Sequence, residues 1–206
     1  NIAKKINFYD SEVRSNNFEI RNSFNSRDLN KKNILIFGYG RIGKKVADIC
    51  NFFNMNVFVY DKFLKLENLS NNTKIVNNIN ENLNIYDFIS LHIPFSNSEK
   101  ALIDKTFLNK LKSDCAIINT SRGDLINEND LISHLNENKN FYAGLDVFNP
   151  EPPHSKNELL KLKNTILTPH SAAYTEECLS EMSLHCAINI ENFFKGNIDQ
   201  SRLINK

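Results

Sequence analysis

Residues 38–43 read Gly-Tyr-Gly-Arg-Ile-Gly, and this G-x-G-x-x-G pattern constrains the fold more than any other feature of the chain. It directly follows the apolar run 33–37 and opens the segment 42–53, which has helical periodicity. The first glycine permits a tight turn, the second lets the backbone approach a pyrophosphate, and the third lets the helix pack on the strand. Because free N–H groups at a helix start favour anions, the sequence predicts a loop that holds dinucleotide phosphates.

Apolar runs recur along the chain at a spacing of roughly 20 to 30 residues, with helical segments between them. This alternation predicts an α/β fold, a doubly wound parallel sheet of the Rossmann type. Most of the runs are apolar on both faces, as strands between two helix layers are. The expected strands are 33–37, 57–60, 88–91, 116–119, 143–147 and 165–167, with 74–76 as a weaker member. The expected helices are 42–53, 105–111, 128–138, 157–162 and 175–194, the last capped by Thr175.

Asp61 ends the second expected strand, 18 residues after Gly43. A carboxylate there can bind the adenosine ribose hydroxyls and would repel a 2′-phosphate, which favours NAD over NADP. The neighbouring Lys62 leaves some tolerance of NADP open. A tight glycine turn with a surface aspartate is the alternative, but the order of strand, loop, helix, strand and acid disfavours it.

Three residues far apart in the sequence predict hydride-transfer chemistry, which needs a carbonyl made electrophilic and a proton delivered to its oxygen. Arg122 follows a strand and can hold a carboxylate in a forked contact. His170, after Pro169, can exchange a proton near neutral pH, and Glu151 can orient the imidazole. Taken singly, each residue has a structural alternative: an arginine tying loop carbonyls, a hydrogen-bonding histidine and a Pro-Glu-Pro turn.

Five ordered segments together resemble the D-isomer-specific 2-hydroxy-acid dehydrogenases, especially the phosphoglycerate-dehydrogenase-like branch. They are 37–43, Asp-Phe-Ile-Ser-Leu-His-Ile-Pro at 87–94, Asn-Thr-Ser-Arg-Gly at 119–123, Leu-Asp-Val-Phe at 145–148 with Glu-Pro at 151–152, and Thr-Pro-His at 168–170. The resemblance covers nearly the whole chain. It implies that His170 gives or takes the proton, Glu151 is its partner, and Arg122 binds substrate and polarises its carbonyl.

The resemblance also implies NAD as cofactor. Its expected contacts, beyond the glycine loop (Gly38, Gly40, Arg41, Ile42 and Gly43) and Asp61, are Ile93, Pro94, Thr120, Ser121, Asp146, Ser171, Ala172 and Ala173. Asp146 is expected to face the nicotinamide carboxamide, although alone it would equally suit a strand-end hydrogen bond. His92, His134, His154 and His185 are interpreted as structural or surface residues, and no metal site is expected.

Members of this family usually carry an N-terminal segment that forms most of a second, substrate-binding domain and grips the substrate carboxylate. We expect residues 1–175 to form the dinucleotide-binding domain, with 1–13 as a connecting helix, and 176–206 to be a helix and tail that return to the other domain. The resemblance further implies a homodimer formed partly through residues 18–24.

Composition excludes several classes of partner. Lys plus Arg number 25 and Asp plus Glu number 24, so no global positive field favours nucleic acid or acidic lipid. No apolar run approaches the length of a membrane span, and a cytoplasmic location is expected. The four cysteines contain no Cys-x-x-Cys pair and are expected to be reduced.

The sequence leaves three functional hypotheses. The first is an NAD-dependent oxidoreductase that interconverts a D-2-hydroxy acid and its 2-keto acid, with 3-phosphoglycerate-like acids among the candidates. The second is a non-catalytic NAD(H)-binding regulator or a truncated cofactor-binding remnant, which would not need Arg122, Glu151 and His170 as a set. The third is another enzyme class on this fold, although short-chain dehydrogenases are disfavoured because the chain has no Tyr-x-x-x-Lys pair.

Overall fold

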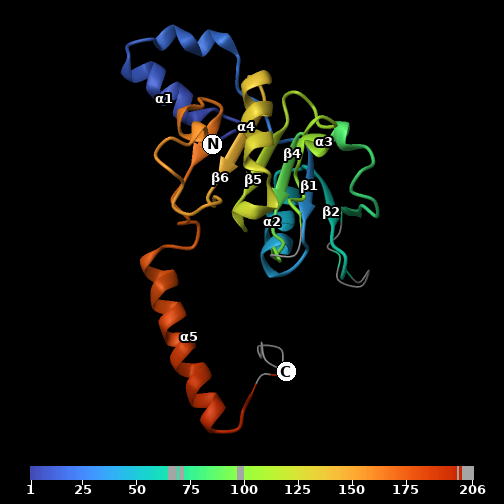
Figure 1. Ribbon diagram of the computed structural model, residues 1–206, viewed down its shortest axis with the longest axis vertical. Helices are drawn as coiled ribbons and strands as arrows, with labels where there is room; N and C mark the ends of the chain where they lie inside the picture. Colours follow the sequence, from blue (N-terminus) through green and yellow to red (C-terminus); the bar gives the residue numbers. More distant parts are fainter. Residues whose placement is uncertain (65–68, 70–71, 97–99, 199, 201–206) are drawn as a thin grey trace. The chain divides into compact units, whose positions relative to one another are not determined.

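A computed structural model of the chain describes residues 1–64, 69, 72–96, 100–198 and 200. Within these residues, seven strands form one parallel sheet in the order β3-β2-β1-β4-β5-β6-β7. Figure 1 shows the central strands side by side, with α2 and α4 against the sheet. The strands are β1 (Asn33–Phe37), β2 (Asn56–Tyr60), β3 (Thr73–Ile75), β4 (Phe88–Leu91), β5 (Ala116–Asn119), β6 (Tyr142–Leu145) and β7 (Thr165–Leu167).

The helices alternate with the strands as the sequence predicts. The α-helices are α1 (Ile6–Arg14), α2 (Arg41–Phe52), α3 (Lys105–Leu108), α4 (Glu128–Glu137) and α5 (Glu176–Phe194). Short 3-10 helices lie at η1 (Phe18–Ser23), η3 (Leu83–Ile85), η4 (Gly123–Leu125) and η5 (Glu158–Lys161). The doubly wound parallel sheet is therefore confirmed.

The two faces of the sheet carry separate hydrophobic cores, because alternate residues of each strand point to opposite sides. In β1, Leu35 and Phe37 join a cluster that includes Leu108 of α3 and Leu131 of α4. Ile34 and Ile36 face the opposite way, in a cluster that contains residues of β2 and α2. All strand residues of β4 are buried. This two-sided burial explains why the central strands are mostly apolar rather than alternating.

The order of strands reverses direction at β1, which pairs with β2 on one side and β4 on the other. Crevices at such switch points, outside the carboxyl ends of the strands, are where open α/β sheets bind ligands. The glycine loop follows β1 at this point. The sheet topology thus gives one edge on which a site can be assembled.

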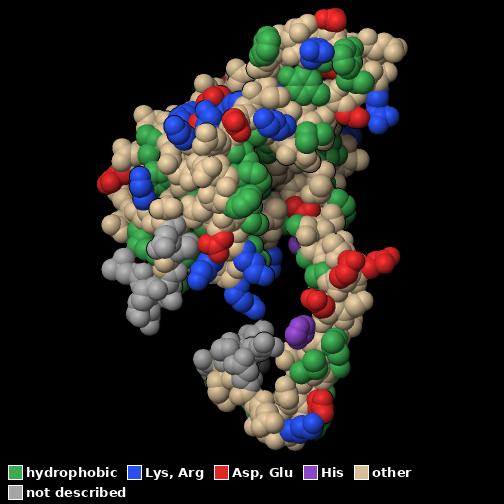
Figure 2. Space-filling model, turned by 180° about the vertical axis from the view of Figure 1, so that it is seen from behind, with side chains coloured by type: hydrophobic (Ala, Val, Ile, Leu, Met, Phe, Trp, Pro, Cys, Tyr) green, Lys and Arg blue, Asp and Glu red, His purple; other side chains and the backbone are tan. Residues whose placement is uncertain are grey.

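The chain divides into two compact units, residues 1–169 and residues 170–206. The first contains the sheet and its helices. The second contains α5, on which Thr175 Oγ1 accepts a hydrogen bond from the backbone N–H of Cys178 at 3.1 Å, the predicted cap. Figure 2 shows hydrophobic and charged side chains interspersed over the visible face of the first unit. The predicted domain boundary near residue 175 stays a prediction, and residues 201–206 of its tail lie outside the described part.

Several element boundaries differ from the expectations by more than one residue. Within the segment 1–13, expected as a connecting helix, the α-helix α1 begins only at Ile6, and the connecting role stays a prediction. β6 ends at Leu145 rather than at residue 147, although the N–H of Asp146 still donates to Asn119 O at 3.0 Å. The helix expected over 105–111 ends as an α-helix at Leu108.

The segment expected as a helix over 157–162 is the 3-10 helix η5. The side chain of Asn157 accepts a hydrogen bond from the N–H of Leu159 at 2.9 Å. Such a local bond from an asparagine side chain favours a tight turn over a regular α-helix.

Candidate cofactor and active site

The glycine loop packs closely against the carboxyl ends of β1, β2 and β4. Gly38 has φ +90° and its N–H donates to Tyr60 O at 2.8 Å. A Cβ on Gly38 would lie 2.4 Å from His92 O and 2.8 Å from Cγ2 of Ile93. A Cβ on Gly43 would lie 1.9 Å from Gly38 O. Only glycine fits at these two positions, as the motif requires.

Gly40 differs from the other two glycines because the protein leaves space beside it. A Cβ there would meet no described atom within 4 Å. Gly40 is also the N-cap residue of α2, and the described residues give this helix start no side-chain cap. The unfilled space at a helix N-terminus suits a pyrophosphate, so the loop fits the phosphates of NAD.

Asp61 stands at the end of β2, beside the glycine loop. Its Oδ2 accepts a hydrogen bond from the N–H of Tyr39 at 2.7 Å, and its Oδ1 accepts one from the N–H of Phe63 at 2.8 Å. Each carboxylate oxygen has two acceptor sites, so ribose hydroxyls can still bind. The predicted ribose-binding carboxylate is thus fixed to the loop that would hold the phosphates.

The loop that carries Arg122 is held in place by a buried asparagine. Asn119, at the end of β5, is 1% exposed. Its Nδ2 donates to Arg122 O at 2.8 Å, and its Oδ1 accepts from the N–H of Ser121 at 3.1 Å. Ser121 Oγ also donates to Leu91 O at 2.6 Å. The backbone of this loop is therefore anchored to β4 and β5.

The Arg122 side chain is exposed, and its Nη1 donates to Ser121 O at 2.6 Å. Thr120, between the strand and the loop, is also exposed. The guanidinium has five N–H donors, so this single bond leaves most of them available to an anionic ligand. Arg122 can therefore bind a carboxylate from this edge of the sheet.

The Glu151 segment adjoins the Arg122 loop. A Cβ on Gly123 would lie 2.1 Å from Phe148 O, so glycine is needed where the two segments meet. Asn149 Nδ2 donates a hydrogen bond to Asp124 Oδ1 across the same junction. Glu151 is exposed, and its Oε1 accepts from the N–H of Phe148 at 2.9 Å. The structure thus brings the Arg122 and Glu151 segments together.

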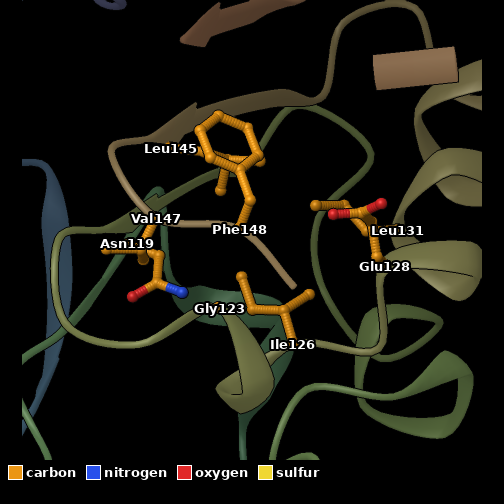
Figure 3. A pocket seen from close by; sticks show the side chains of 8 residues that line it. All are labelled: Asn119, Gly123, Ile126, Glu128, Leu131, Leu145, Val147 and Phe148. Atoms are coloured by element: carbon orange, nitrogen blue, oxygen red, sulfur yellow. The ribbon is translucent and has the colours of Figure 1, made fainter. Parts of the chain in front are cut away.

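Figure 3 shows the interior beneath this junction, where a cavity of about 10 Å³ is lined by Asn119, Gly123, Ile126, Glu128, Leu131, Leu145, Val147 and Phe148. A space of this size holds at most one water molecule. It is a packing gap under the loops and not a substrate pocket. A larger surface hollow of about 400 Å³ is lined by Tyr9, Arg21, Phe24 and Ser26, in the segment before β1 and away from the carboxyl edge.

Asp146, predicted to face the nicotinamide, is 3% exposed at the end of β6. Its Oδ1 accepts a hydrogen bond from Thr168 Oγ1 at 2.5 Å. Ile93 and Pro94 follow β4, and Ile93 lies against Gly38. Sequence reasoning assigned no role to the side chains of Thr168 or Asn119. Their positions at the ends of predicted neighbouring strands were the signal that could have identified them.

His170 is the first residue of the second unit, is exposed, and has φ +51°. Ser171, Ala172 and Ala173 follow it before the cap of α5. Since these residues and the Arg122 and Glu151 segments belong to different units, the meeting of the three catalytic side chains stays a prediction. The same holds for the cofactor contacts expected at 171–173.

Two other histidines are accounted for by their packing. Burial lowers the pKa of His92, whose Nε2 lies 2.8 Å from Ser90 Oγ. Burial also lowers the pKa of His134 in α4, whose ring packs edge-on against Phe141 at 4.6 Å between centroids. In the described parts of the chain, no three His, Cys, Asp or Glu side chains are grouped as a metal site would need. No helix there has the length and apolarity to span a bilayer.

The fold and this edge define a dinucleotide-binding domain of the Rossmann type. Residues 1–172 match the family described as D-isomer specific 2-hydroxyacid dehydrogenase, NAD binding domain, and the chain belongs to this family. The predictions of the family and of NAD as its cofactor are confirmed at this level.

Named relatives agree with the family assignment. The chain is 34% identical to a D-3-phosphoglycerate dehydrogenase of Archaeoglobus fulgidus over 94% of its own length and 37% of the relative's. It is 34% identical to a glyoxylate reductase of Thermococcus litoralis over 100% of its own length and 63% of the relative's. Among solved structures, an acyclic imino acid reductase in complex with NADPH and D-Arg is 31% identical, with a TM-score of 0.83 over 96% of this chain and 62% of that one. The chain therefore spans about a third to two thirds of these relatives.

Proposed function

We propose that the protein is an NAD-dependent oxidoreductase that interconverts a D-2-hydroxy acid and its 2-keto acid. The observation that carries this proposal is the junction of the Arg122 and Glu151 segments, at the carboxyl edge of the sheet that also bears the glycine loop. A domain that only binds the nucleotide needs the loop but has no use for this second assembly. Family membership supports the same chemistry.

Each of the three residues has a distinct role in this reaction. Arg122 binds the substrate carboxylate through its forked N–H groups and polarises the adjacent carbonyl. His170 gives a proton to the carbonyl oxygen during reduction and takes it back during oxidation. Glu151 accepts a hydrogen bond from the imidazole and holds it in one orientation. The bound cofactor would supply the hydride as NADH when the keto acid is reduced, and would accept it as NAD when the hydroxy acid is oxidised.

The cofactor contacts of the proposal follow the carboxyl edge. The phosphates bind at Gly38, Gly40, Arg41, Ile42 and Gly43, and Asp61 binds the adenosine ribose. Nearer the nicotinamide, the contacts are Ile93, Pro94, Thr120, Ser121, Asp146, Ser171, Ala172 and Ala173. Both carboxylate oxygens of Asp61 are held by backbone N–H groups, which supports NAD rather than NADP because a 2′-phosphate would meet a fixed negative charge there.

The substrate proposed is a small 2-keto or 2-hydroxy acid, with acids that resemble 3-phosphoglycerate among the candidates. Relatives named D-3-phosphoglycerate dehydrogenase, glyoxylate reductase and hydroxypyruvate reductase all support this class. We also propose that the protein acts in the cytoplasm as a homodimer. Phe18 and Phe24 support the dimer because they are 61% and 87% exposed in the segment expected at its interface.

The test is NADH oxidation by the intact protein with a panel that contains glyoxylate, hydroxypyruvate, pyruvate and 3-phosphohydroxypyruvate. Wild-type protein should oxidise NADH only when a 2-keto acid is present, and Arg122→Ala should raise KM for that acid while NADH binding is kept. If the protein binds NADH but turns over no 2-keto acid, the alternative of a non-catalytic NAD(H)-binding regulator or cofactor-binding remnant replaces this proposal. Light scattering at micromolar concentration tests the dimer, which a monomeric mass would exclude.

A further inference from the structure

The ends of β6 and β7 place two polar side chains next to each other. Leu145 and Leu167 pair in the ladder between these strands, and each is followed directly by a polar residue, Asp146 and Thr168. The N–H of Thr168 donates to Leu145 O at 3.0 Å. The backbones therefore stay in register one step beyond the strands, and the two side chains meet at the carboxyl edge.

Their contact is a short, charge-assisted hydrogen bond. Thr168 Oγ1 donates to Asp146 Oδ1 at 2.5 Å, the lower end of the range for a hydroxyl and a carboxylate. Asp146 is 3% exposed, so its carboxylate has lost most of its contact with water. A buried carboxylate depends on such donors, and each donor restricts the direction in which the other oxygen points.

The donor itself is held firmly. Threonine is β-branched, so its χ1 angle has few alternatives. Pro169 follows Thr168 and restricts the backbone of the residue before it. Asp146 is fixed from its other side, where its N–H donates to Asn119 O at 3.0 Å. The backbones of Thr168 and Asp146 are thus both restrained, in addition to the hydrogen bond between their side chains.

From this geometry we infer that Thr168 is a positioning residue for cofactor binding. Its hydroxyl sets the orientation of the Asp146 carboxylate, which in turn receives the carboxamide of the nicotinamide ring. The inference rests on the proposed function for the role of Asp146. It adds a residue outside the predicted site, in the segment that leads directly from β7 to His170.

A purely structural role would have a different consequence. The bond would then only satisfy a buried carboxylate, and its loss would lower stability without changing how the folded protein binds NADH. A positioning role predicts a change in NADH affinity in protein that is still folded. The two roles are therefore separated by measuring binding and melting temperature in the same variants.

The experiment compares three variants of the intact protein. Thr168→Val keeps the shape of the side chain and removes the hydroxyl, whereas Thr168→Ser keeps the hydroxyl. Thr165→Val is the matched control, because Thr165 begins β7, the strand that Thr168 directly follows, and its Oγ1 donates to the turn carbonyl of Leu162 at 2.9 Å rather than to Asp146. NADH affinity is measured by fluorescence titration without substrate, together with melting temperature and the steady-state constants.

We expect Thr168→Val to bind NADH about tenfold more weakly, with KM for NADH raised in step, as loss of a hydrogen bond to a charged group predicts. Thr168→Ser should restore most of the affinity. Thr165→Val should lower the melting temperature and leave NADH affinity unchanged. Unchanged NADH affinity in folded Thr168→Val, or an equal loss in Thr168→Ser, would overturn the inference.

The binding assay also separates this inference from the proposed function. If no 2-keto acid is reduced but Thr168→Val still weakens NADH binding and Thr168→Ser restores it, the enzyme assignment fails and the positioning role stands. If turnover is normal and Thr168→Val binds NADH like wild type, the enzyme assignment stands and the positioning role of Thr168 fails.

Discussion

The backbone N–H of Tyr39 donates a 2.7 Å hydrogen bond to Oδ2 of Asp61, which ties the glycine loop to the end of β2. The carboxylate proposed to bind the ribose is therefore also part of the loop's support. Its second oxygen accepts from the N–H of Phe63. One side chain thus supports the turn proposed to bind the phosphates and carries the carboxylate proposed to select NAD.

Asp61→Ala should lower both NADH affinity and stability. The substitution removes the acceptor of two backbone N–H groups, at an expected cost of about 1–2 kcal/mol in the free energy of unfolding. Because the loop loses its anchor, NADPH affinity should not rise to the level of wild-type NADH affinity. Chemical denaturation and titration with both nucleotides measure these effects.

The control for Asp61→Ala is Asp48→Ala, which removes the same charge from an exposed position on α2. It should leave NADH affinity and stability near wild-type values. A variant Asp61→Ala that is as stable as wild type and prefers NADPH would show that Asp61 acts only as a selectivity filter.

Gly40→Ala and Gly43→Ala should have opposite effects on folding and binding. The new Cβ at position 40 would enter open space, so we expect a melting temperature close to wild type but strongly reduced NADH binding, since that space is proposed to hold the pyrophosphate. Gly43→Ala would place a Cβ 1.9 Å from Gly38 O and should destabilise the fold by about 3 kcal/mol. Thermal melts and NADH titration distinguish the two variants. Tight NADH binding by Gly40→Ala would contradict the proposed position of the phosphates.

Stability should decrease as the pH falls below about 6.5, in part because of His134. Burial lowers the pKa of this imidazole from its usual 6.5, so below that pH the unfolded chain binds more protons than the folded one. The contribution of neutral His134 to the free energy of unfolding is therefore fully present above the pKa of this residue in the unfolded chain. It is lost as the pH falls through the lower pKa of this residue in the folded protein. His92, whose pKa is also lowered by burial, acts in the same direction.

The measurement is the free energy of unfolding by urea between about pH 5 and pH 8, a range chosen to span the usual imidazole pKa. His134→Gln should flatten the acid side of this profile, whereas His154→Gln removes an exposed imidazole and should leave it unchanged. An unaltered slope in His134→Gln would show that the buried ring does not contribute.

Two of the four cysteines should resist thiol reagents while the protein is folded. Burial raises the pKa of the Cys50 thiol to about 11 and that of Cys115 to about 12, so little reactive thiolate forms near neutral pH. Cys186 is exposed on α5 and should react first. Titration with a chromogenic disulfide should show Cys50 and Cys115 reacting only after unfolding, and Cys186→Ser should remove the fastest phase. Rapid reaction of all four thiols in native protein would contradict this burial.

The sheet was predictable from the sequence because its strands are short apolar runs separated mainly by helical segments. β1, β4, β5 and β7 have the predicted bounds. The end of β6 was not predictable from composition, since Val147 remains buried after the ladder stops at Leu145. Burial alone therefore does not mark where strand pairing ends.

The polar contacts at the site could not be predicted from the sequence in the same way. Tyr39 and Asp61 are 22 residues apart, and Asp146 and Thr168 are also 22 apart. Periodicity reports which face of an element is apolar, but it does not say which side chains at the ends of different strands meet. That information comes from the register of the sheet, which is a property of the folded chain.

The proposed function requires Arg122, Glu151 and His170 to converge beside the nicotinamide in the intact protein. A crystal structure of that protein with NAD and a non-reactive 2-keto acid analogue measures this most directly. We expect the His170 imidazole within about 3.2 Å of the Glu151 carboxylate and of the analogue's carbonyl oxygen, with the Arg122 guanidinium on its carboxylate. A bound analogue with these three side chains apart from one another, or directed away from the nicotinamide, would contradict it.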